Sequence, residues 1–150
     1  MRWLIDLLTN PFLLTSLCSW FLAQVLKVII NAILHKKMIW ERLVGDGGMP
    51  SGHSATVASL ATIVGLVCGF GSAPFAMAGI LAVIVCHDAM GVRQETGKQA
   101  VMLNEIIRIL EEEALPEVKL KELVGHTPLQ VLAGILIGIA NACFMYFVIL

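Results

Sequence analysis

Residues 45–70 read GDGGMPSGHSATVASLATIVGLVCGF, a glycine-rich run followed by the motif PSGHS at 50–54 and an apolar stretch that continues to Phe70. An apolar stretch of this length is typical of a membrane-crossing helix, because a hydrocarbon core needs about 20 helical residues. The first turn of such a helix offers N–H groups without intrahelical partners, and glycines let an anion approach the backbone. The residue types alone also fit a glycine-rich turn with an ordinary Pro/Ser helix cap.

The composition of the chain, 150 residues with 58% hydrophobic and 14% charged residues, is too apolar for an ordinary soluble domain. Four stretches can cross or nearly cross a bilayer, at about 17 to 24 residues each; they cover 11–34, 51–70, 73–89 and 128–150. Only Gly71-Ser72 separates the second from the third, which predicts a tight helical hairpin. We therefore predict an all-α integral membrane bundle of about four transmembrane helices, forming one domain over residues 1–150.

The basic residues are distributed unevenly between the two sides that four crossings would create. The connecting segments 34–50 and 90–127 share one side, and the termini share the other, where Arg2 is the basic residue. The shared-side loops carry Lys36, Lys37, Arg42, Arg93, Lys98, Arg108, Lys119 and Lys121. The positive-inside rule places these loops in the cytoplasm and both termini outside.

Polar residues form a stripe on the first apolar segment. Gln24, Lys27, Asn31 and His35 recur at intervals of three, four and four, which puts them on one helical face. An ionisable residue such as Lys27 inside a transmembrane segment is costly and usually faces protein, water or a ligand. A lysine that snorkels to the interface is the alternative interpretation.

An amphipathic helix is predicted between residues 98 and 115. Its apolar residues recur at helical spacing opposite Glu105, Arg108 and Glu112; they are Val101, Leu103, Ile106, Ile107 and Leu110. This pattern is typical of a helix that lies on a membrane surface. Pro116 breaks it.

The predicted topology brings the chemically interesting residues to one membrane face. Lys27 and Asn31 approach that face on the first helix, and residues 51–54 begin the second. Asp88 and Arg93 follow the third, where they form either a solvated surface pair or a structural or catalytic ion pair. His126 precedes the fourth helix, which Thr127 can cap. Cations, N–H donors and two histidines suit phosphoryl transfer, with one histidine attacking phosphorus and the other protonating the leaving oxygen.

Other site classes have less support in the sequence. Two histidines with Asp88 could bind a divalent cation, but their spacings match no metal motif, so neither a metal nor another cofactor is expected. The four cysteines lie in apolar stretches and fit packing roles. Gly65-x-x-x-Gly69 and Gly134-x-x-x-Gly138 permit close helix packing, within a protomer or in a homodimer. The membrane is an expected partner, and a nucleic acid is not.

The motifs resemble a known superfamily. Pro50-Ser51-Gly52-His53 matches the central motif of the type-2 phosphatidic acid phosphatase and vanadium haloperoxidase superfamily, and residues 126–134 resemble the segment around its nucleophilic histidine. The whole chain is most similar to a divergent branch of four-span membrane proteins, on the motifs Gly47-Gly48-Met49-Pro50-Ser51, Asp88-Ala89-x-Gly91-Val92-Arg93, Gln99-Ala100 with Leu103-Asn104, and Gly125-His126-Thr127-Pro128.

This resemblance implies roles for individual residues. His126 would attack phosphorus to form a phosphohistidine, and His53 would act as general acid. Phosphate oxygens would be held by Ser51 and Gly52, with Lys27 in place of the lysine of the superfamily's first motif.

Two positions depart from the superfamily's third motif. Leu120 stands where an arginine is usual, and Gln130 stands where an aspartate follows the nucleophile. Arg93 could replace the missing cation and Asp88 the missing carboxylate. A carboxylate stabilises the imidazolium form of a histidine, whereas the amide of Gln130 only orients the ring.

Three hypotheses about function follow. The first is a membrane-embedded, metal-independent phosphatase that hydrolyses a lipid phosphate or diphosphate from the cytoplasmic leaflet. The second is a catalytically weak or inactive membrane protein that keeps the phosphate cradle to bind a phosphate-bearing lipid or a protein partner, as Gln130 would favour. The third is a phosphatase for a soluble phosphomonoester.

Overall fold

The computed structural model describes residues 2–35, 48–110, 120 and 125–149. The regular secondary structure in these ranges is helical throughout: α1 Arg2–Leu8, α2 Pro11–His35, α3 Gly52–Cys68, α4 Ala73–Met90, α5 Val92–Leu110, α6 Pro128–Phe144 and the π-helical turn η3 Met145–Ile149. The chain is therefore an integral membrane helical bundle, as the sequence predicts.

The four apolar stretches all form helices, but they differ in length. The segments long and apolar enough to span a bilayer, among the residues described, are Pro11–Ile33, Ala73–Ile109 and Pro128–Ile149. α3 has only 17 residues, roughly 26 Å at 1.5 Å per residue, which is slightly shorter than a typical hydrocarbon core. The number of crossings therefore stays a prediction.

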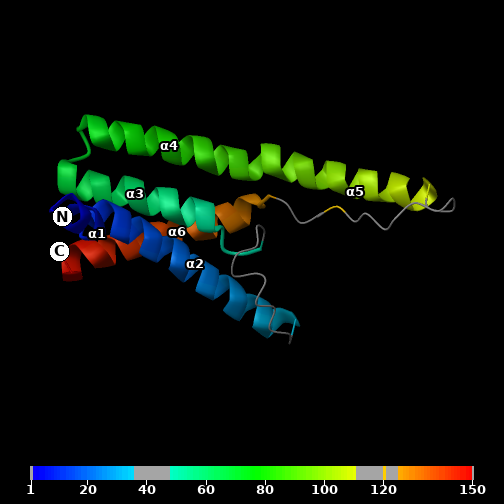
Figure 1. The fold of residues 1–150 in the computed structure, drawn as a ribbon, viewed down its shortest axis with the longest axis horizontal. Helices are drawn as coiled ribbons and strands as arrows, with labels where there is room; N and C mark the ends of the chain where they lie inside the picture. Colours follow the sequence, from blue (N-terminus) through cyan, green and yellow to red (C-terminus); the bar gives the residue numbers. More distant parts are fainter. Residues whose placement is uncertain (1, 36–47, 111–119, 121–124, 150) are drawn as a thin grey trace.

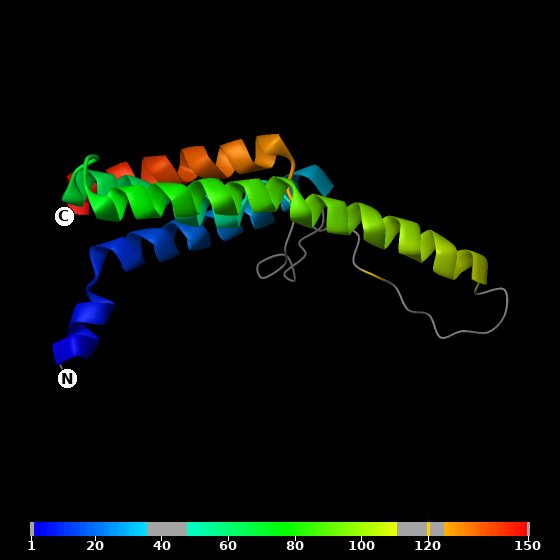
Figure 2. The same cartoon turned by 90° about the horizontal axis from the view of Figure 1, so that it is seen from above.

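α3 is the central helix of the bundle. It packs against α2, α4 and α6, and α2 also contacts α6 (Figure 1). The start of α2 and the end of η3 lie at one end of the bundle, whereas α3 and α6 begin at the other end (Figure 1). The short helix α1 turns away from the bundle where Asn10 caps α2 by accepting from the backbone of Phe12 and Leu13 (Figure 2).

Glycines on α6 allow it to approach α3 closely. A Cβ atom on Gly134 would collide with the carbonyl oxygen of Ser51, and one on Gly138 would collide with that of Ala55. The prediction that this glycine pair permits close packing is confirmed, and the contact lies within one protomer. In the other glycine pair, Gly65 packs beneath the ring of Phe70, and Gly69 ends α3 with a φ of +88°.

Polar contacts also join α2 to α6 inside the bundle. The side-chain amide of Asn141 donates to the backbone oxygen of Thr15 at 3.3 Å and to the hydroxyl of Ser19 at 2.8 Å. Thr15 and Ser19 are completely buried. Hydrogen bonds of this kind commonly join helices in a membrane, where they contribute about 0.6 kcal/mol each. They fix the position of α2, which carries the polar stripe.

The helical hairpin and the amphipathic helix are both present. α3 and α4 are joined by the turn at 69–72, and Ser72 caps α4. The amphipathic helix α5 begins earlier than predicted, at Val92, and its predicted end at 111–116 lies outside the described residues. α5 continues α4 past the start of α3, with Gly91 between the two helices (Figures 1 and 2). Its position on a membrane surface stays a prediction.

Candidate functional site

The start of α3 is the point where the other helices of the bundle meet. The amide of Ser51, just before α3, donates to the carbonyl oxygen of Gln130 on α6 at 3.0 Å. The amide of His126, just before α6, donates to the carbonyl oxygen of Ala89 on α4 at 2.9 Å. These two backbone hydrogen bonds tie the beginnings of α3 and α6 to the end of α4.

Two histidines face each other at this junction. The ring centroids of His53 and His126 lie 6.2 Å apart, with their planes inclined by 59°. His126 is 3% exposed, and His53 is partly buried. Each imidazole can reach about 3 Å toward a group held between the two rings. The predicted histidine pair is therefore brought together, although its members are far apart in the sequence.

Gln130 sets the protonation pattern of His126. Its side-chain oxygen Oε1 accepts from the amide of Thr127 at 3.0 Å and lies 3.3 Å from Nδ1 of His126. Since an amide oxygen only accepts hydrogen bonds, Nδ1 must carry the proton in this contact. In a neutral imidazole with this contact, Nε2 keeps a lone pair, which is the requirement for attack on phosphorus. A capping box between Thr127 and Gln130 holds this arrangement at the start of α6.

Gly125 determines how closely the His126 turn approaches the α4–α5 junction. Its φ is +90°, and a Cβ atom there would lie 2.7 Å from the backbone carbon of Arg93 and equally close to the Cα atom of Gln94. Only glycine fits both this conformation and this contact. In the sequence Gly125 belongs to the motif Gly125-His126-Thr127-Pro128, which carries no sign of this steric role.

Lys27 and Asn31 are buried on the same face of α2. Lys27 is 3% exposed, so it does not snorkel to solvent, and its aliphatic stem packs beside Gly48. Asn31 is 6% exposed, and its side-chain oxygen has no hydrogen-bond partner among the residues described. The predicted polar stripe therefore faces the protein interior. The side chain of His35 lies outside what the structure describes.

Ser51 and Gly52 begin α3. The hydroxyl oxygen of Ser51 accepts from the amide of Ser54 at 3.3 Å and from the Ser54 hydroxyl at 3.0 Å. Ser51 is completely buried, so it anchors the first turn of α3. Gly52 faces α2, where Trp20 and Gln24 lie against it. This last contact is not predicted from the sequence, because periodicity does not show where two helices cross.

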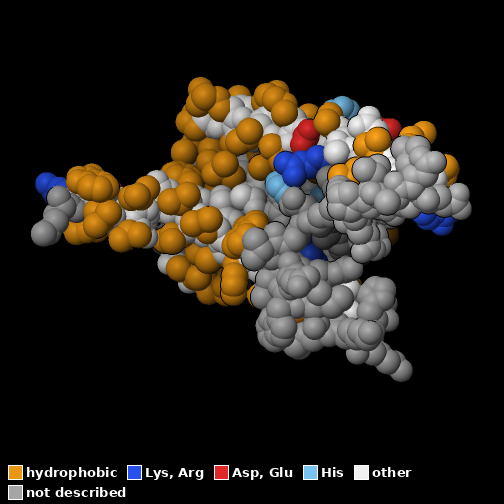
Figure 3. Space-filling model, turned by 45° about the vertical axis from the view of Figure 1, so that its right-hand side comes forward, with side chains coloured by type: hydrophobic (Ala, Val, Ile, Leu, Met, Phe, Trp, Pro, Cys, Tyr) orange, Lys and Arg blue, Asp and Glu red, His pale blue; other side chains and the backbone are white. Residues whose placement is uncertain are grey.

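Asp88 and Arg93 pair with each other beside the His126 turn. Nε of Arg93 lies 3.0 Å from a carboxylate oxygen of Asp88, and both side chains are about two-fifths exposed. Such an exposed ion pair contributes at most about 1 kcal/mol to stability. Charged and histidine side chains gather at this end of an otherwise apolar surface (Figure 3). Within the described ranges, no three His, Cys, Asp or Glu residues form a group that could hold a metal ion.

Leu120 is attached to α5 by two hydrogen bonds. The side chain of Asn104 donates to the carbonyl oxygen of Leu120 at 2.9 Å and accepts from the amide of Leu120 at 2.8 Å. A side-chain amide can make both bonds at once because it carries a donor and an acceptor. Leu120 stands where the superfamily's third motif usually has an arginine. In the structure its backbone makes the contact with Asn104.

Comparisons with known proteins give consistent findings. The model of a family described as the divergent PAP2 family matches residues 8–141. YuiD, an uncharacterised membrane protein of Bacillus subtilis (strain 168), is 43% identical to this chain over an alignment that covers 89% of this chain and 92% of the relative. No solved structure matches the chain significantly.

Proposed function

Because this chain belongs to the divergent PAP2 family, we propose that it is a membrane-embedded, metal-independent phosphatase that hydrolyses a lipid phosphate or diphosphate through a phosphohistidine. One observation carries the proposal: the ring centroids of His53 and His126 lie 6.2 Å apart, and Nδ1 of His126 is beside the side-chain oxygen of Gln130. In the proposed reaction Nε2 of the neutral His126 ring is the nucleophile.

The proposed reaction has two steps. In the first, Nε2 of His126 bonds to phosphorus, the bond from phosphorus to the lipid oxygen breaks, and protonated His53 gives its proton to that oxygen. In the second, neutral His53 takes a proton from a water molecule, whose oxygen attacks phosphorus and breaks the P–N bond. Inorganic phosphate leaves, and both histidines return to their starting states.

The residues around the histidines would hold the phosphate. Lys27 supplies a buried positive charge, and the amide of Gly52 at the start of α3 supplies an N–H donor. Asn31 adds a polar group from the same face of α2 as Lys27, while Ser51 keeps the first turn in place. Arg93 is a second cation at the rim, and Asp88 orients it.

The proposed topology has four crossings, with the site loops in the cytoplasm and both termini outside. It is supported by the position of both ends of the described chain at the end of the bundle opposite the site (Figure 1). The pair Gly134 and Gly138 packs against α3 within the protomer, so a homodimer would use other surfaces. A reporter at Lys119 that lies outside the cell would contradict this orientation.

A specific observation favours a second candidate function. Nδ1 of His126 lies against the neutral side chain of Gln130 rather than a carboxylate, so Gln130 gives a cationic ring little stabilisation during attack. In this second candidate the protein binds phosphate-bearing lipid, or a protein partner, and turns over slowly or not at all.

Phosphate release from a panel of lipid phosphates by purified protein separates the two candidates. His126→Ala and His53→Ala should abolish release, and a chelator should leave it unchanged. His87→Ala is a matched control because His87 is exposed on α4 and is not one of the residues proposed to react with or bind phosphate. Full activity in His126→Ala would contradict the proposed nucleophile, and no release from any substrate would favour the binding protein.

A further inference from the structure

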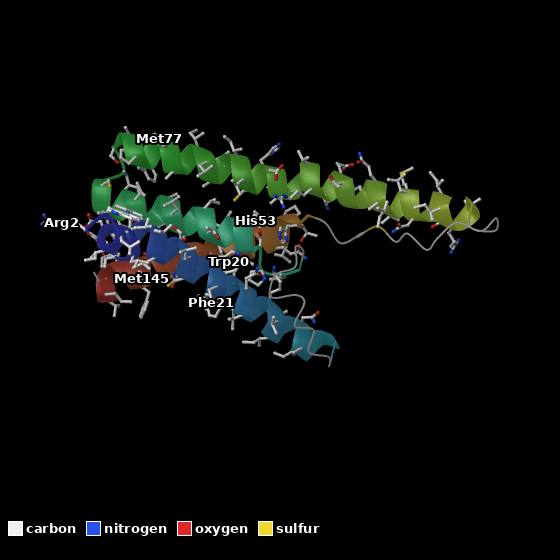
Figure 4. All side chains as sticks on the ribbon, in the orientation of Figure 1. Arg2, Trp20, Phe21, His53, Met77 and Met145 are labelled. Atoms are coloured by element: carbon white, nitrogen blue, oxygen red, sulfur yellow. The ribbon has the colours of Figure 1, made fainter. Side chains whose placement is uncertain are left out.

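Two side chains of α2 that have no role in the proposed reaction lie against the first residue of α3. A Cβ atom on Gly52 would be 3.5 Å from Cδ1 and 3.7 Å from Nε1 of Trp20, and 3.8 Å from the amide carbon of Gln24. Figure 4 shows Trp20 on α2 and His53 at the start of α3, on neighbouring parts of the bundle. The point where α2 crosses the start of α3 therefore lies on the α2 side of the candidate site.

Trp20 connects the site to the lipid-facing surface. The polar edge of its indole is turned toward Gly52, whereas 40% of the residue is exposed on the outside of α2. Its neighbour Phe21 is 62% exposed, and both belong to the candidate membrane span Pro11–Ile33. Tryptophan combines a large apolar face with one N–H donor, so it suits a position between hydrocarbon and polar groups.

Gln24 brings an unsatisfied polar group to the same crossing. It is 6% exposed, and its side-chain oxygen has no hydrogen-bond partner among the described residues. A buried polar atom without a partner is costly, so this crossing is a place where a bound molecule can complete a hydrogen bond. An ester or phosphate oxygen only accepts, so Gln24 binds it with the side-chain amide turned over, through the N–H donors.

We propose that Trp20 and Gln24 form the lipid-side entrance of the site, where the oxygen-rich link between the phosphate and the acyl chains of a lipid phosphate binds. The indole lies along the start of the acyl chains, and the Gln24 amide binds the polar link beside Gly52. A soluble phosphomonoester has no chains to contact Trp20, so this surface selects lipids. The position of the entrance rests on the proposed function, but lipid binding there does not require turnover.

A fluorescence experiment tests binding without using activity. The sequence has three tryptophans, so replacing Trp3 and Trp40 by phenylalanine leaves Trp20 as the one tryptophan that fluoresces. The protein is placed in phosphatidylcholine vesicles that contain a small, equal fraction of either brominated phosphatidic acid or brominated phosphatidylcholine. We expect stronger quenching of Trp20 by the brominated phosphatidic acid, because a lipid phosphate is enriched at the entrance.

The matched control keeps Trp3 and replaces the other two tryptophans. Trp3 is 69% exposed on α1, at the end of the bundle away from the site. It should be quenched equally by both brominated lipids. In the Trp20 protein, Gln24→Leu should abolish the preference for phosphatidic acid, and His126→Ala should preserve it. A preference for phosphatidic acid in protein with an intact His126, together with no phosphate release by that protein, would refute the proposed enzyme while supporting the entrance.

Three results would overturn the inference. The first is equal quenching of Trp20 by the two lipids, which would assign Trp20 to ordinary contact with the bilayer. The second is the same preference at Trp3, which would show general attraction to anionic lipid. The third is complete displacement of the brominated phosphatidic acid by soluble glycerol phosphate, which would show that the phosphate alone is recognised.

Discussion

The side-chain oxygen of Gln130 lies 3.3 Å from Nδ1 of His126, one helical turn along the start of α6. The same oxygen accepts from the amide of Thr127, so the cap of α6 and the orientation of the imidazole depend on one atom. Gln130 therefore supplies the geometry that a carboxylate would give, without its negative charge.

Gln130→Glu should make the protein a faster phosphatase. A carboxylate at the same place would stabilise the imidazolium that forms as His126 attacks, and glutamate is also a good capping-box residue, so the fold should be kept. We expect phosphate release to rise by about tenfold or more, below the roughly 10⁴-fold effect of the equivalent acid in a serine protease. The turnover rate on a saturating lipid phosphate measures this. Slower turnover in Gln130→Glu than in the original protein would contradict the assigned role.

Gly134→Ala should destabilise the bundle. The added methyl group would collide with the carbonyl oxygen of Ser51, and backbone atoms cannot move aside cheaply. Overpacking of this kind costs about 1 to 3 kcal/mol of unfolding free energy. Gly79→Ala is the matched control, because a Cβ atom there meets nothing within 4 Å. Thermal unfolding in detergent compares them, and equal midpoints would show that α3 and α6 are not in close contact.

Gly125→Ala should lose phosphate release although the protein loses only some of its stability. Both the φ of +90° and the contact with Arg93 and Gln94 oppose a methyl group, so the His126 turn must move. Gly69→Ala separates the two causes, because Gly69 has a φ of +88° but open space around it. We expect both variants to lose some stability and only Gly125→Ala to lose phosphate release. Normal release by folded Gly125→Ala would show that the turn can shift without harm.

Asn104→Ala should weaken the attachment of Leu120 to α5. Two hydrogen bonds to the backbone of Leu120 would be lost, each worth about 0.5 to 1.5 kcal/mol. The amide of Leu120 should exchange with solvent faster, and phosphate release should fall. Gln99→Ala, on an exposed position of the same helix, should change neither. Unchanged exchange at Leu120 would contradict the contact.

The sequence predicts the helices well because their signals are local. Long apolar stretches, Pro and Ser or Thr caps, and the Gly71-Ser72 turn each act within one or two helical turns. It also predicts that His53 and His126 meet, since alternating crossings bring the starts of their helices to one side. Both inferences need only helix length and direction.

The remaining details depend on how helices cross, which periodicity does not specify. The contact of Gln24 with Gly52, for example, follows from the angle between α2 and α3. The role of Gly125 depends on a close backbone contact with α5, 31 positions earlier for Gln94. No pattern within a single segment carries that information.

Trapping of a phosphoenzyme tests the central claim most directly. Protein is mixed with a lipid phosphate labelled with ³²P, denatured within one turnover at alkaline pH, where phosphohistidine survives, and digested to locate the label. We predict label on the peptide that contains His126, absent from His126→Ala and present in His87→Ala. Phosphate release without label on His126, or label that persists in His126→Ala, would contradict the account.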